Sequence, residues 1–130
     1  MSTLAVGTIK SISSAAPVIK NSAGVEKARY IKAFVRYDMT IASISSSFGI
    51  SSMTDNGEGI CTANFTTAFT AHDSYAASCL GNGDVVDGAH VYPCTFFGDV
   101  AAGSFKIAFF KNTSSNSRKD QVRMWMTFTE

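Results

Sequence analysis

The sequence predicts an all-β protein, an antiparallel β-sandwich of jelly-roll-like form preceded by an N-terminal β arm. Three observations predict it. Apolar residues recur with a period of two, no stretch shows the period of about 3.6 that marks a helix, and Gly, Asn and Asp cluster between the apolar segments. Short strands separated by such turn clusters are typical of sandwiches. A chain of 130 residues has room for one domain with a real core.

The arm is predicted to occupy residues 1–28. A strand is expected at residues 4–9, and the segment "SSAAPVIKNSAGVEK" (13–27) is small and polar and contains Pro17, which indicates a turn and a short hairpin. An arm with little core of its own is not stable alone, so we expect it to pair with the sandwich or with a neighbouring subunit. Residues 29–130 are the predicted sandwich domain.

The sandwich is predicted to begin with "YIKAFVRYD" (30–38), where apolar and polar side chains alternate. Further strands are expected at residues 40–44, 48–53, 60–66, 75–80, 90–97, 105–110 and 122–128. In the last of these, one face carries a row of large apolar side chains, namely Val122, Met124, Met126 and Phe128, and the other face carries Trp125. Large side chains on both faces predict burial on both sides.

The stretch "SSMTDNGEGICTANFTTAF" (51–69) predicts a hairpin. Asp55, Asn56 and Gly57 tolerate positive φ and can reverse the chain between two strands. Residues 68–76 are then expected to cross an open corner into the next strand. Nothing in this hairpin indicates chemistry.

Composition restricts the partners. The net charge is +1 and the basic residues form no patch or stripe, which excludes nucleic acid and an anionic membrane as expected partners. Charged residues make up only 16% of the chain, below the roughly 25% typical of globular domains, which favours a subunit of an assembly. The N-terminal "MSTLAVGTIKSISS" lacks the features of a signal peptide, and no apolar run approaches membrane-spanning length, so we expect assembly in a cytoplasm.

A search for catalytic, metal-binding and cofactor-binding residues gives none, and we predict that the protein is not an enzyme. His90 and Cys94 lie on one face of a predicted strand but about 13 Å apart, too far for a dyad. Cys61, Cys79 and Cys94 lack the close pairs of zinc sites and are interpreted as packing residues, with a tertiary metal site as the less favoured alternative. No cofactor is expected.

The loop "KNTSSNSRKDQ" (111–121) allows two interpretations. The favoured one is a solvated hairpin loop between strands. The other is a contact with a partner, because amides and hydroxyls can bind glycan or backbone groups and basic side chains can meet carboxylates. The candidate contact residues under this second interpretation are Asn112, Asn116, Arg118 and Lys119.

At "ISSMTDNGEGICTANFTTAF" the sequence resembles a module of tailed-bacteriophage virion proteins, in which a strand ending "VSSITDNGTGDY" runs into "TVNFTTAM" and a corner ending "NYA". The corner here is "TAHDSYA". The opening "MSTLAVGTIKS" and "AAPVIKNSAGVE", the strand "YIKAFVRYD" and the closing "RKDQVRMWMTF" are similar to the same family, including its tail-fibre-like proteins. The chain departs from the pattern at "MTIASIS", which replaces a glycine-rich insert, and at Cys61, where a polar or acidic residue is usual.

The resemblance implies a non-enzymatic structural protein on the surface of a bacteriophage virion. Its expected role is a capsid decoration, cement or minor tail accessory subunit, with the receptor-binding head of a tail fibre or spike as the alternative. Expected partners are other virion proteins of the capsid or tail, further copies of the chain in a homotrimer, and a host surface glycan. The expected location is the virion.

Overall fold

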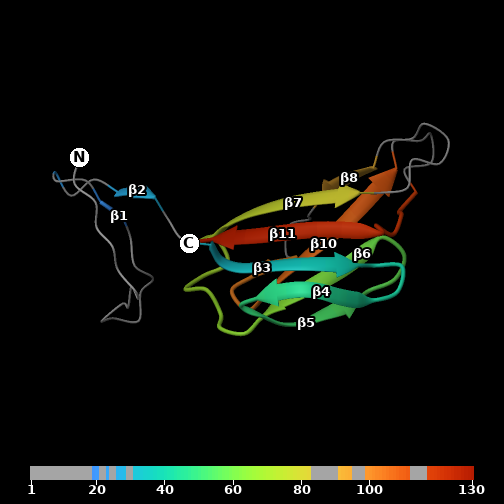
Figure 1. Cartoon of the computed structure of the whole chain (residues 1–130), viewed down its shortest axis with the longest axis horizontal. Helices are drawn as coiled ribbons and strands as arrows, with labels where there is room; N and C mark the ends of the chain where they lie inside the picture. Colours follow the sequence, from blue (N-terminus) through green and yellow to red (C-terminus); the bar gives the residue numbers. More distant parts are fainter. Residues whose placement is uncertain are drawn as a thin grey trace.

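A computed structural model of the chain describes residues 19–20, 23, 26–28, 31–82, 91–94, 99–111 and 117–130. These residues form strands and turns and no helix, and two antiparallel sheets pack face to face (Figure 1). The prediction of an all-β antiparallel sandwich is therefore confirmed. Within this described part of the chain, no helix has the length and apolar character needed to cross a membrane.

The first sheet has four strands in the order β4-β3-β11-β7. Their bounds are Ile31–Asp38 for β3, Ser43–Phe48 for β4, Ala76–Asn82 for β7 and Arg123–Thr129 for β11. All three pairings are antiparallel. The inner face of the sheet comes from the period of two, since every second residue of β3 and β11 is buried.

The second sheet has the order β5-β6-β10-β8, and β9 also pairs with β10. Its strands are Ile50–Asp55 (β5), Ile60–Phe65 (β6), Val91–Cys94 (β8), Val100–Ala101 (β9) and Ser104–Lys111 (β10). The edge strands β4 and β5 lie along one side of the sandwich and β7 and β8 along the other (Figure 1). Two short strands, β1 (Ile19–Lys20) and β2 (Glu26–Ala28), pair with each other in a separate sheet.

A single residue, Gly49, carries the chain from β4 of one sheet to β5 of the other. Its φ is +67°, and a Cβ there would lie 2.5 Å from the carbonyl oxygen of Lys32. Both the left-handed backbone and the close approach require glycine. This corner fixes where both edge strands begin and end.

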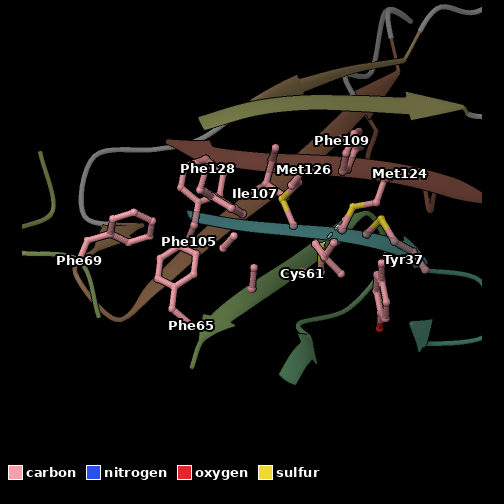
Figure 2. Close-up of a cluster of buried hydrophobic side chains, with 14 residues drawn as sticks. Tyr37, Cys61, Phe65, Phe69, Phe105, Ile107, Phe109, Met124, Met126 and Phe128 are labelled. Atoms are coloured by element: carbon pink, nitrogen blue, oxygen red, sulfur yellow. Dashed lines mark hydrogen bonds between the residues drawn. The ribbon is translucent and has the colours of Figure 1, made fainter. Parts of the chain in front are cut away.

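The core between the sheets is aromatic at one end and sulfur-rich at the other (Figure 2). At the aromatic end, the Phe65 ring meets the rings of Phe69, Tyr75 and Phe128 edge to face, with centroids 4.7, 5.6 and 4.8 Å away. At the other end the thiol of Cys61 lies 3.7 Å from the sulfur of Met124. Residues 68–75 lead into β7 as the sequence predicted, and Phe69 and Tyr75 also pack this corner against the core.

Two cysteine thiols are described, and both are reduced. Burial raises the pKa of Cys61 and of Cys79 to about 12, so both thiols are neutral near pH 7. Cys61 is fully buried in the core. The side chain of Cys94 and all of His90 lie outside the described residues.

The 51–69 hairpin forms, but its turn differs from the predicted one. The residues with positive φ are Gly57 and Gly59, not Asp55 or Asn56. The Asp55 carboxylate instead accepts a hydrogen bond from the backbone N–H of Gly57 at 2.9 Å. Asn56 accepts one from the hydroxyl of Thr62 at 2.7 Å. Both side chains therefore support the turn through hydrogen bonds.

Three details of the predicted strands are wrong. The strands expected at 40–44 and 48–53 are found at 43–48 and 50–55, because residues 39–42 form the turn after β3. The Asp38 carboxylate accepts hydrogen bonds from the N–H and the hydroxyl of Thr40 within this turn. Val122 precedes β11 and is 40% exposed. Trp125 is 38% exposed rather than buried, since no described segment covers its face of the sheet.

Candidate functional site: an exposed strip on the four-stranded sheet

The outer face of the four-stranded sheet carries exposed apolar and aromatic side chains. Cross-strand register places them in two rows that run across all four strands. The first row is Phe48, Phe34, Thr127 and Ser78, and the second is Ser46, Arg36, Trp125 and Leu80. We call five members of these rows the outer-face strip, namely Phe34, Arg36, Phe48, Leu80 and Trp125.

The members of the strip are exposed to very different degrees. Leu80 is 71% exposed and Phe48 60%, while Trp125 is 38% exposed. Phe34 is half-buried and stacks on Phe48, with ring centroids 6.4 Å apart. Contiguous exposed apolar groups of this kind mark interaction surfaces more often than scattered ones do. Tryptophan, phenylalanine and arginine are also enriched at protein interfaces.

The outer face of the other sheet is different in character. There the Asn64 amide donates hydrogen bonds to the hydroxyls of Ser52 and Thr54, each at 3.0 Å. Lys106 forms an ion pair with Asp99 at 3.1 Å. Polar side chains that are satisfied by one another need no partner and suit contact with water. Of the two outer faces, that of the four-stranded sheet is therefore the better candidate for binding.

A groove of about 360 Å³ lies beside the Phe48 end of the strip. It lies at the Gly49 corner, and its lining includes Lys32, Phe48, Gly49, Thr66, Thr67 and Phe69. Thr66 and Thr67 are exposed, and Phe69 is only 4% exposed. The volume of this groove is at the lower end of the range of small-molecule pockets. An exposed ring, exposed hydroxyls and an apolar floor can hold a small ligand with both polar and apolar faces.

The charge in this groove is balanced within the chain. Lys32 forms an ion pair with Glu130, and its Nζ lies 4.6 Å from the centroid of the Phe69 ring. Glu130 also accepts hydrogen bonds from the N–H and hydroxyl of Thr70 and the hydroxyl of Ser74. The bond from Lys32, followed by the backbone bond from Thr70, lowers the pKa of Glu130 to about 2. The groove is therefore suited to an uncharged ligand.

The described residues of the predicted contact loop lie away from the outer-face strip. Asn112 and Asn116 lie outside the described residues. Arg118 is exposed and pairs with Phe110 in an isolated bridge, and its guanidinium lies 5.9 Å from the Phe110 ring centroid. The backbone N–H of Lys119 donates to the carbonyl of Phe109 at 3.0 Å. Both residues therefore extend the five-stranded sheet, and the structure does not bring them together with the outer-face strip.

The same loop and the groove lie at opposite ends of strand β6. Gly59, just before β6, donates its N–H to Asp120 at 2.6 Å, whereas Thr66, just after β6, lines the groove. Six residues of strand separate the two ends by roughly 20 Å. The described end of the candidate loop is thus a different surface from the groove, whereas the strip and the groove share Phe48. Among the described residues, no group of three or more His, Cys, Asp or Glu side chains is arranged to hold a metal ion.

No protein-family model matches this chain, and no curated protein matches it. A similar solved structure is the phiAB6 tailspike, crystallised in complex with three-repeated oligosaccharides of Acinetobacter baumannii surface polysaccharide. The two chains are 18% identical with a TM-score of 0.49, and the match covers 97% of this chain and 30% of that chain. The chain thus spans less than a third of the length of this tailspike.

Proposed function

We propose that this chain is a non-enzymatic structural protein on the surface of a bacteriophage virion. It is a decoration, cement or minor tail accessory subunit, and it attaches to other virion proteins through the outer-face strip. The likeness of "SSMTDNGEGICTANFTTAF" to the virion-protein module supports the lineage. The observation that carries the attachment is the exposed strip itself, with Leu80 71% exposed and Phe48 60% exposed on one face. The protein forms a homotrimer, is assembled in the host cytoplasm and becomes part of the virion.

A matched pair of variants tests the attachment. Leu80→Ser removes an apolar side chain from the strip, and Ile41→Ser removes one that is equally exposed, at 71%, in the turn before β4. We expect Leu80→Ser to reduce the occupancy of the protein on purified particles, measured by cryo-electron microscopy, and Ile41→Ser to leave it unchanged. Equal occupancy for Leu80→Ser and the wild type, or absence of the wild-type protein from particles, would contradict the proposal.

A second candidate function is the receptor-binding head of a tail fibre or spike. The groove favours it, because the exposed Phe48 ring and the hydroxyls of Thr66 and Thr67 suit an uncharged, hydroxyl-rich ligand such as a host surface glycan. The two functions separate in one adsorption assay on host cells. Under the second function, Thr67→Val abolishes adsorption and Leu80→Ser leaves it intact. Under the first, neither variant alters adsorption.

A further inference from the structure

Arg36 occupies the centre of the outer-face strip. It lies between Ser46 on β4 and Trp125 on β11 in the cross-strand register, and its Cζ is 5.8 Å from the centroid of the Trp125 ring. The side chain is half-buried, and its Nε atom is buried without a hydrogen-bond partner. No carboxylate of the described residues forms an ion pair with it.

The other cations on this sheet each interact with a carboxylate. Lys32 pairs with Glu130 at the end of the sheet. The charge of Arg123 contributes to lowering the pKa of the Asp38 carboxyl, after the side-chain hydrogen bond from Thr40 and the backbone hydrogen bonds from Thr40 and Ile41, while desolvation opposes them. Arg36 is thus the cation of the strip that lacks a counter-ion among the described residues.

The guanidinium of Arg36 lacks a carboxylate partner among the described residues. A guanidinium carries five N–H donors in a planar fork that matches a carboxylate, and a half-buried charge without such a partner is costly. Nε is the one Arg36 nitrogen found both buried and unpartnered, so Nη1 and Nη2 are the atoms that a partner can reach. The Trp125 ring holds the guanidinium in place from one side.

We propose that the strip docks on a virion protein that places one Asp or Glu carboxylate on the Nη atoms of Arg36. Apolar side chains of that protein surround the carboxylate and cover Phe48, Trp125 and Leu80. A protein fits this face better than a saccharide does, because the strip lies across four adjacent strands and combines aromatic residues with arginine, as the centres of protein interfaces do. This inference rests on the proposed function and names the chemistry of its partner.

The ion pair between Arg36 and the partner's carboxylate strengthens binding substantially only when water is excluded from it. Once the neighbouring apolar side chains cover Arg36, the ion pair is shielded from water and is strengthened accordingly. Removing the cation then leaves the partner's carboxylate buried and unpaired. Arg36→Gln is therefore expected to weaken binding by about 30-fold or more. Arg36→Lys keeps the charge but loses the fork, so its binding should lie between those of Arg36→Gln and the wild type.

The test adds purified wild-type and variant chains to particles assembled without this protein and measures bound protein against concentration. Arg123→Gln is the matched control, since it makes the same chemical change two residues from Trp125 and outside the strip. We expect it to bind within about twofold of the wild type, as a rim charge does. Melting temperatures of all variants confirm that they are folded. Raising the salt concentration should weaken the wild type more than Arg36→Gln.

The outcomes separate the inference from the function on which it rests. In one outcome the wild type binds, Leu80→Ser does not bind, and Arg36→Gln binds as the wild type does. The strip is then the attachment site, and the proposed pairing of Arg36 with a partner carboxylate is refuted. If the wild type does not bind particles, the proposed function fails and the inference fails with it. Arginine-dependent binding to carboxylate-bearing host polysaccharide, without binding to particles, would overturn the protein partner in favour of a saccharide.

Discussion

At the scale of single residues, Gly59 shows how tightly the sequence is tied to the fold. It precedes β6 with a φ of +67°, and a Cβ there would lie 2.5 Å from the backbone nitrogen of Lys119 and 2.9 Å from the carbonyl oxygen of Phe109. Neither neighbour is a side chain that can rotate away. The hairpin turn and the described end of the 111–121 loop therefore meet only because this residue has no side chain.

Gly59→Ala is expected to lower the free energy of unfolding by about 2–4 kcal/mol, from backbone strain and from the clash together. Gly103→Ala is the control, because a Cβ at Gly103 meets nothing within 4 Å. Its effect should stay within about 0.5 kcal/mol. Urea denaturation of the two variants measures both. Similar stabilities for Gly59→Ala and Gly103→Ala would show that the turn relaxes without cost.

At the scale of elements, β11 shows how the two faces of its sheet differ. Met124, Met126 and Phe128 are at most 1% exposed, whereas Trp125 between them is 38% exposed. Met126→Ala leaves a cavity in the core and is expected to cost about 2–5 kcal/mol. Trp125→Ala loses only a partly exposed contact with Arg36 and is expected to cost about 1 kcal/mol. Thermal unfolding of both variants tests this, and an equal loss would mean that the outer face is also part of the core.

The strands rich in large side chains were predictable and the edge strand β4 was not. In β3 and β11 an apolar side chain at every second position marks the inner face, so their positions agree with the structure to within one or two residues. In β4, five of six residues are serine or isoleucine and all are exposed, so the sequence holds no inward row to place it. The turn at 39–42 and the corner at Gly49 set its bounds instead.

The outer-face strip was not predictable for a related reason. In the sequence Trp125 alternates with Met124 and Met126, and that pattern predicts burial on both sides. Only the register of four strands places Trp125 between Arg36 and Leu80, and Phe34 beside Phe48. Pairings between residues so far apart in the chain leave no local pattern. Arg118 and Lys119, by contrast, are predicted from local composition, and they pair with β10 of the other sheet.

At the scale of the whole molecule, the two outer faces of the sandwich differ in their side chains. The five-stranded sheet presents polar side chains that satisfy one another, and the four-stranded sheet presents the strip. A protein that contacts water on one face and a partner on the other is suited to cover a surface. Under the proposed function, we expect the contact between copies of a homotrimer to lie away from the strip, because a strip used between copies would not reach a second virion protein.

We therefore predict that the N-terminal arm assembles the proposed homotrimer. Its described strands, β1 and β2, pair only with each other, while the two sandwich sheets are built from β3 to β11. Deleting residues 1–28 is therefore expected to leave the melting temperature within a few degrees of the full chain, since the described strands of that segment pair with neither sandwich sheet. Multi-angle light scattering should report a trimer for the full chain and a monomer for residues 29–130. A truncated chain that stays trimeric would place the contact on the sandwich, and one that fails to fold would make the arm part of its core.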